Sequence, residues 1–251
     1  MANSTSGKSQ KMSSSSSIFV LDPDGDLLLS VGSPSKNSHR VFRVCSSDVR
    51  QSSPVWKAVV DEQLSRSNDT GSAIGISGSG DRKIVALPDD NPLSIRVLLA
   101  IVHKKYDLVP KTLTGLFPGQ LYDVVATAQK YRIITLVRPW AQSWISILHE
   151  AKSQPLTKQR GLGGMLLVYS TYIAWELGDE ILFASTVRQI CIDASTYHAA
   201  GGLALMHQDC QPILFKKVAH FGPSDLLGMY HHHTEHLYPS AQVKTFLTPL
   251  I

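Results

Sequence analysis

Apolar residues recur at helical spacing through most of the chain after residue 90, and this pattern constrains the fold most. Leu121, Val124, Val125 and Ala128 match the i, i+3, i+4, i+7 pattern of an amphipathic helix without a miss. Stripes of similar period begin at residues 93, 137, 162 and 183. Helices of this kind must bury their apolar faces against one another or against a sheet. We therefore predict a group of packed helices, with Leu121 and Trp140 in its core.

Before residue 45 the pattern changes to that of short strands. Apolar runs cover residues 18–21 and 27–31, and Asp22-Pro23-Asp24-Gly25 lies between them. This tetrapeptide has the composition of a tight β-turn, which predicts two antiparallel strands joined directly. Further strands are expected at residues 39–45 and 83–87. A few strands followed by many helices predict an α+β fold, a small sheet covered by helices.

Composition divides the chain into segments. Residues 1–17 are rich in serine and offer little apolar surface to offset the entropy of ordering, so a disordered tail is expected. Residues 18–149 hold the predicted sheet and its helices, with a mobile Ser/Gly/Asn-rich loop at residues 65–82. Residues 150–160 are polar and contain a proline, as in a linker. Residues 161–251 are predicted to form an all-helical extension, weakly patterned after residue 200.

Charge and cysteine content exclude several classes of protein. Twenty-four basic and 20 acidic side chains give a net charge of +4, too small and too scattered to predict nucleic-acid binding. The short basic patches Lys104-Lys105, Arg132 and Arg138 are interpreted as solvated faces. Three widely separated cysteines do not suggest a disulfide scaffold. With a polar amino terminus and no apolar run of about 18 residues, the chain is expected to be intracellular, in the cytoplasm or nucleus.

One short motif supports a catalytic hypothesis. His232, Glu235 and His236 spell H-x-x-E-H, the signature of an inverted zinc protease. That chemistry needs both histidines on one face of a stable helix and a third ligand. Gly228 and Pro239 flank the motif and disfavour a long helix. A solvated histidine cluster is the favoured interpretation, and a metal-dependent hydrolase that uses these three residues is the alternative.

Other apparent binding motifs fail on spacing. The aspartates of residues 22–26 resemble the start of a calcium loop, but the glycine is one position early and Ser33 stands where a bidentate glutamate is needed. The glycines of residues 71–80 are followed by Asp81-Arg82 instead of the Lys-Ser or Lys-Thr of a phosphate loop. No G-x-S-x-G nucleophile motif occurs. We therefore expect a protein that is not an enzyme and that uses no cofactor or metal.

Several short segments follow one another in an order that is typical of one family. They are Asp22-Pro23-Asp24-Gly25-Asp26-Leu27-Leu28-Leu29, Phe42-Arg43-Val44, Ser53-Pro54-Val55-Trp56-Lys57-Ala58-Val59, Leu87-Pro88-Asp89-Asp90, Ala128-Gln129-Lys130-Tyr131 and residues 136–144. Together they resemble the BTB/POZ domains of filamentous fungi, over residues 18–149. The later stretch Ala174-Trp175-Glu176-Leu177-Gly178-Asp179-Glu180 resembles the helical region that follows such domains.

The resemblance implies a non-enzymatic module for protein–protein interaction, a small sheet capped by helical hairpins. Such domains self-associate, dock another BTB-like chain or another protein, or act as adaptors for a cullin ubiquitin ligase. Residues 1–17 are too polar to supply the apolar helix that precedes the first strand in many of these dimers.

The same resemblance indicates where a partner would bind. Cullin adaptors tend to carry a hydrophobic-x-Glu motif after the Ser-Pro helix. The matching position here is Leu64-Ser65-Arg66, which reverses the charge, and the literal match Val60-Asp61-Glu62 lies four residues earlier. Val60, Glu62 and Leu64 are the candidate partner contacts.

Overall fold

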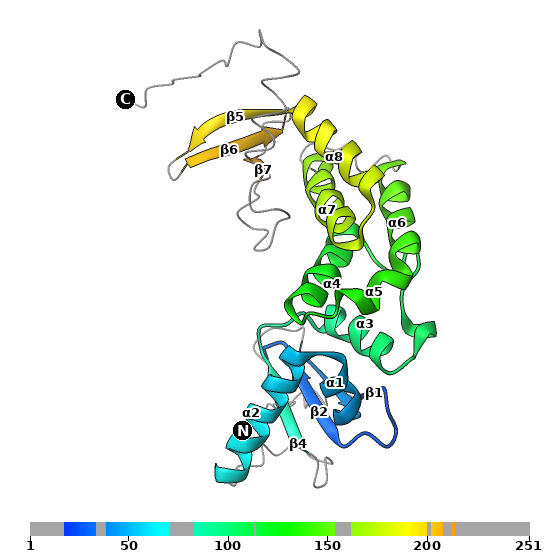
Figure 1. Ribbon diagram of the computed structural model, residues 1–251, viewed down its shortest axis with the longest axis vertical. Helices are drawn as coiled ribbons and strands as arrows, with labels where there is room; N and C mark the ends of the chain where they lie inside the picture. Colours follow the sequence, from blue (N-terminus) through cyan, green and yellow to red (C-terminus); the bar gives the residue numbers. More distant parts are fainter. Residues whose placement is uncertain are drawn as a thin grey trace, which may run out of the picture.

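The computed structural model shows an α+β fold, as the sequence predicts (Figure 1). The residues that the structure describes are 18–33, 39–70, 83–112, 114–153, 162–199, 202–207 and 212–213. The first sheet lies with α1 and α2 at one end of the molecule, and the later helices stack away from it toward α7 and α8. Among the described helices, none is both long and apolar enough to cross a membrane.

The first sheet has four strands, all of which the sequence predicts. They are β1 (Ile18–Val20), β2 (Leu27–Val31), β3 (Arg40–Val44) and β4 (Lys83–Leu87). Their spatial order is β1-β3-β2-β4. Strands β2 and β3 pair antiparallel, with Leu29 opposite Phe42, and β4 runs parallel to β2, with Val85 opposite Leu29. These three side chains are buried, so the central strands contribute to the core.

The predicted direct hairpin between β1 and β2 is wrong. Strand β1 pairs in parallel with β3, which lies between β1 and β2. The turn itself forms, because the Gly25 amide donates to the Asp22 carbonyl oxygen at 3.1 Å. It crosses β3 closely: a Cβ at position 25 would lie 2.6 Å from the Val44 carbonyl oxygen, so only glycine fits. The turn composition predicted the change of direction but did not specify which strands pair.

Two helices follow β3, and the second is longer than predicted. They are α1 (Ser46–Ser52) and α2 (Pro54–Thr70). Residues 65–70 were expected in the mobile loop but belong to α2, and residues 71–82 lie outside the described part of the chain. Side chains one turn apart support this end of α2: the Ser65 hydroxyl donates to the Asp61 carbonyl oxygen, and Arg66 pairs with Glu62 at 2.7 Å.

Helix α2 also covers the exposed edge of the sheet. Strand β4 is an edge strand, whose free amide and carbonyl groups would otherwise be open to another chain. The Gln63 side chain occupies both groups of Ala86: its Nε2 donates to the Ala86 carbonyl oxygen at 2.9 Å, and its Oε1 accepts from the Ala86 amide at 2.8 Å. Residue 63 thus has a structural role within the segment predicted to bind partners.

The remaining helices form a stack with one continuous core. They are α3 (Pro92–Val102), η1 (Tyr106–Leu108), α4 (Pro118–Lys130), α5 (Ile134–Val137), η2 (Arg138–Trp140), α6 (Ala141–Ser153), α7 (Leu162–Leu177) and α8 (Glu180–Asp193). Leu121 is fully buried, as predicted. Trp140 is only partly buried, because the tight turn η2 interrupts the helical stripe, and Trp144 takes the central position.

The predicted division at residues 150–160 is not a break in the core. Helix α6 continues through Ser153, and a single cluster of buried apolar residues extends from the sheet into α7 and α8. Tyr122 of α4 packs against Tyr169 and, edge to face, against Tyr172 of α7, each at a centroid distance of 5.0 Å. The first helices after residue 161 therefore share the core of the preceding segment.

The prediction that residues 161–251 are all helical is wrong after Asp193. A second antiparallel sheet follows, made of β5 (Ala194–Ala199), β6 (Gly202–His207) and β7 (Pro212–Ile213). Thr196 and Tyr197 favour strands, and the glycines at 201–202 favour a tight reversal, so the local sequence is that of a hairpin.

Candidate partner-binding site

The structure separates the three predicted contact residues. Val60 and Leu64 lie on the inner face of α2, with only 1% and 8% of their surfaces exposed, and both belong to the core. Glu62 is exposed on the outer face. A partner can therefore reach Glu62, whereas contact with the other two would require α2 to leave the sheet.

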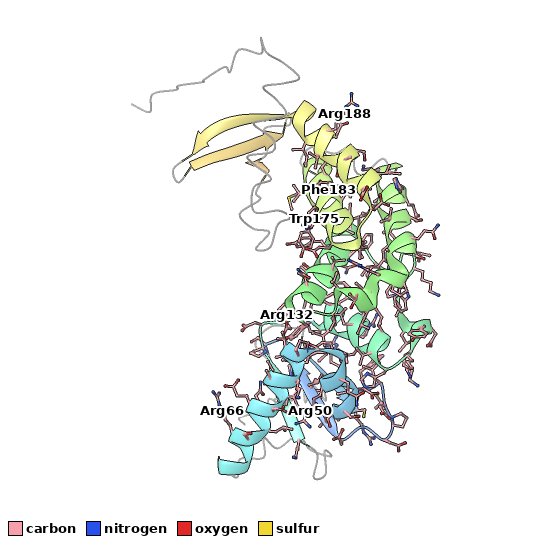
Figure 2. All side chains as sticks on the ribbon, viewed as in Figure 1. Arg50, Arg66, Arg132, Trp175, Phe183 and Arg188 are labelled. Carbon is pink, nitrogen blue, oxygen red and sulfur yellow. The ribbon has the colours of Figure 1, made fainter. Side chains whose placement is uncertain are left out.

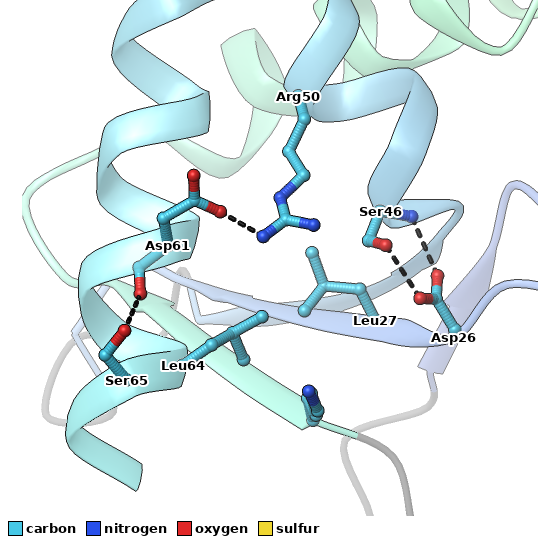
Figure 3. A pocket seen from close by; sticks show the side chains of 8 residues that line it. Asp26, Leu27, Ser46, Arg50, Asp61, Leu64 and Ser65 are labelled. Carbon is cyan, nitrogen blue, oxygen red and sulfur yellow. Dashed lines mark hydrogen bonds and ion pairs between the residues drawn. The ribbon is translucent and has the colours of Figure 1, made fainter. Parts of the chain in front are cut away.

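A hollow of about 500 Å³ opens beside this segment, between α1, α2 and the start of β2 and β4 (Figure 3). We call it the α1–α2 hollow. Its lining consists of Asp26, Leu27, Ser46, Arg50, Asp61, Leu64, Ser65 and Lys83. Arg50 of α1 and Asp61 of α2 form an ion pair at its wall.

Asp26 closes the amino-terminal end of α1 from a distant part of the chain. Its Oδ1 accepts from the Ser46 amide at 2.8 Å, and its Oδ2 accepts from the Ser46 hydroxyl at 2.7 Å. Burial alone would raise the pKa of Asp26, but these hydrogen bonds and the nearby Arg50 charge outweigh it and lower the pKa below the usual value. The carboxylate is therefore ionised at neutral pH and serves as a helix cap.

The α1–α2 hollow has a lining of mixed charge. Two carboxylates face two cations, so the lining favours neither charge. The hydroxyls of Ser46 and Ser65 donate to the Asp26 carboxylate and to the Asp61 carbonyl oxygen, and the described lining residues include neither histidine nor cysteine. Across the described residues, no group of three or more His, Cys, Asp or Glu side chains could hold a metal ion.

The H-x-x-E-H segment of the hydrolase hypothesis, His232 to His236, lies outside the described residues. The short basic patches are described. Lys104, Arg132 and Arg138 are exposed at the ends of α3, α4 and α5, and the first two have positive φ angles of 57° and 56°.

A polar network that the sequence analysis did not predict joins two of the segments behind the family resemblance. Asp90, only 9% exposed, accepts from the Tyr131 hydroxyl at 2.5 Å and from Lys130 Nζ at 2.7 Å. Burial and then this hydrogen bond raise the pKa of Tyr131 far above its usual value. Both segments stood out in the sequence as short motifs, but their contact spans 41 residues, which no local pattern reveals.

Two pairs of packed aromatic rings lie partly exposed elsewhere on the described surface. Trp175 and Phe183, at the α7–α8 turn, pack at a centroid distance of 5.4 Å, and Trp175 is 45% exposed (Figure 2). Tyr106 and Trp140 pack at the same distance beside α6. Sequence periodicity assigned Trp140 to the core, so it gave no signal for this second exposed pair.

No model of a known protein family matches the chain, and no curated protein matches it.

Proposed function

We propose that this protein is a non-enzymatic protein-interaction module of the BTB/POZ type. The sequence resemblance supports the proposal, and the structure is compatible with it: an antiparallel β2–β3 pair, two helices, a strand parallel to β2 and then stacked helices follow in order. The buried Asp90–Tyr131 contact joins two of the motifs of the resemblance in space.

The observation that carries the proposal is the exposed strip of α2 beside the α1–α2 hollow. Glu62 and Arg66 form its outer face, with side-chain exposures of 60% and 75%. The helix is held from beneath by Val60 and Leu64 and at the sheet edge by Gln63. A rigid support with charged, solvated side chains next to a hollow suits reversible docking of another protein.

The candidate partners are a second copy of the chain, another BTB-like chain, and a cullin. Burial of Val60 removes the hydrophobic residue of the literal Val60-Asp61-Glu62 motif from the surface. A cullin would therefore bind through Glu62, Arg66 and the rim of the hollow.

The proposal is tested on the purified full chain by two measurements. Light scattering on a size-exclusion column gives the mass of any assembly, and titration with a purified cullin gives its affinity. Glu62→Lys reverses one exposed charge on α2. Glu180→Lys makes the same change on α8, at the opposite end of the molecule in Figure 1, and is the matched control.

Self-association or cullin binding that Glu62→Lys weakens by about tenfold, and that Glu180→Lys leaves unchanged, supports the α2 strip as the contact. A monomer that binds no BTB-like chain and no cullin removes support for the proposal. Stoichiometric zinc in the untagged chain, with hydrolase activity lost in Glu235→Gln, would overturn the non-enzymatic assignment in favour of the His232–Glu235–His236 hypothesis.

A further inference from the structure

A second surface, on a different part of the molecule, combines exposed aromatic rings with unbalanced charge. Tyr106 of η1 is 48% exposed, and its ring packs 5.4 Å from that of Trp140 in η2. Trp140 is itself partly buried and rests on the core. Aromatic side chains that are anchored on one side and open on the other are typical of the centres of protein interfaces.

Four cations belong to the three short segments that carry or adjoin this ring pair in the sequence. Lys104 and Lys105 immediately precede Tyr106, and Arg138 lies two residues before Trp140 in the same turn. Lys111 follows Pro110, whose carbonyl oxygen accepts from Trp144 Nε1 at 2.9 Å, so it lies beside the start of α6. We call Tyr106, Trp140 and these four cations the aromatic–basic surface.

None of the four cations has a carboxylate partner within ion-pair distance among the described residues. Their side chains are exposed. One carboxylate, Asp107, lies among them. Lys104 and Lys105 also complement the carboxyl end of α3, but Lys111 lies in a loop and gains nothing of this kind. By contrast, Arg50 and Arg66 beside α2 are both paired with carboxylates.

We propose that the aromatic–basic surface docks an acidic segment of a partner protein, which packs an apolar side chain on the Tyr106–Trp140 ring pair. The excess of three positive charges over the single Asp107 selects an acidic ligand and speeds its approach. The exposed ring face supplies affinity through burial of apolar area. The carboxylates of an acidic peptide complement the four cations, and its apolar side chain complements the ring pair. A single-stranded nucleic acid, which also combines charge with rings that stack on aromatic side chains, is an outcome that the test distinguishes.

The test selects ligands from a random peptide library on the immobilised full chain, and then measures the affinity of the enriched peptides. We expect acidic residues on both sides of an aromatic or aliphatic residue. The double variant Lys111→Glu/Arg138→Glu should bind these peptides at least about tenfold more weakly. Tyr106→Ala should weaken binding by about tenfold as well. Glu62→Lys on α2 should leave the affinity unchanged, which separates this surface from the contact proposed above.

The charge variants alter only exposed side chains, so an unchanged thermal transition confirms that a loss of binding is local. Failure to enrich any peptide, enrichment of neutral or basic peptides, or equal binding to the double variant overturns the proposal. A single-stranded DNA oligonucleotide is measured in parallel on the same proteins. If it binds more tightly than the peptides and the double variant abolishes this binding, the surface is a nucleic-acid site and the proposal is wrong.

Discussion

Different kinds of contact stabilise two parts of the molecule. We call the first sheet and the helices around it the sheet half, and α6 to α8 the helical half. In the sheet half, side chains form hydrogen bonds with groups far along the chain. Asp26 accepts from Ser46, Gln63 donates to Ala86, and His103 Nε2 accepts from the Cys45 amide at 3.1 Å. In α6 to α8, the described side-chain hydrogen bonds mostly return to a carbonyl oxygen one turn earlier, as in Thr171 to Leu167.

The stability of the helical half depends instead on close packing of apolar side chains. Helix α7 is buried over most of its circumference, and it meets α4 through packed tyrosine rings. Apolar packing is non-directional, so it sets how much free energy the contact contributes more than which atoms meet. Removing volume should therefore harm the helical half most, and removing one polar atom should harm the sheet half and its boundary with the helices.

The largest effect is expected from loss of volume in α6. Trp144 is fully buried and Trp140, one turn earlier, is only partly buried. We expect Trp144→Ala to lower the free energy of unfolding by about 3–5 kcal/mol, and Trp140→Ala to lower it by about 1–2 kcal/mol. Urea denaturation of both variants checks the difference. Equal losses would mean that the η2 turn does not separate the two side chains as described.

The next largest effect is expected from loss of one hydroxyl group. Two tyrosines allow the comparison: Tyr122 within α4 and Tyr131 at its carboxyl end. Tyr131 donates its hydroxyl to the buried Asp90, whereas the Tyr122 hydroxyl donates to no described side chain. Both rings remain in Phe variants. We expect Tyr131→Phe to cost about 1.5–3 kcal/mol, because a buried carboxylate loses a hydrogen bond, and Tyr122→Phe to cost less than about 0.5 kcal/mol. A similar cost for both variants would show that ring packing, and not the hydrogen bond to Asp90, stabilises the contact between the sheet half and the helices.

The contrast explains how much the sequence could predict. Helical periodicity located α3, α4, α7 and most of α8, and strand composition located β1 to β4, because these signals arise from neighbours in the chain. Pairing of β1 with β3 and the burial of Val60 depend on contacts between distant segments, which periodicity does not encode.

The candidate site was predicted less completely for the same reason. Glu62 lies on the surface as expected. Its neighbour Gln63 forms hydrogen bonds with the edge of β4, and Asp61 forms an ion pair with Arg50. The Val60-Asp61-Glu62 motif is local to one helix, so it does not indicate which face of that helix packs on the sheet. Trp140 was misplaced because one proline-containing turn shifted the phase of the stripe, and that shift created the exposed ring pair.

A smaller, pH-dependent effect is expected at the amino-terminal end of α1. Asp26→Asn removes a carboxylate that accepts two hydrogen bonds from Ser46, and we expect a cost of about 1 kcal/mol at neutral pH. The folded-state pKa of Asp26 is lowered, so its stabilisation is complete above the ordinary value of 3.8 and is lost as the pH falls below it. The melting temperatures of the two proteins should therefore converge in acid.

Asp89→Asn, at an exposed turn position without a described side-chain contact, is the control and should follow the wild type at every pH. A constant difference between Asp26→Asn and the wild type down to acid pH would contradict the role of the charge.

The smallest effect is expected to be stabilising, and it tests the helix ends where the two halves meet. Helices α3 and α4 each end in a Schellman motif: Lys105 N donates to the Ala100 carbonyl oxygen at 2.8 Å, and Ile133 N donates to that of Ala128 at 2.9 Å. The left-handed position that favours glycine is occupied by Lys104 and by Arg132, with φ of 57° and 56°.

Glycine at either position removes the clash of Cβ with the backbone, which stabilises the folded state. It also adds entropy to the unfolded chain, which offsets part of that gain. We expect Lys104→Gly and Arg132→Gly each to raise the free energy of unfolding by about 0.5–1 kcal/mol. Lys105→Gly is the matched control, because its φ of −86° suits any residue, and it should be neutral or destabilising. Denaturant titration of the three variants measures the order, and a gain at Lys105 equal to that at Lys104 would show that loss of charge, not backbone strain, is the cause.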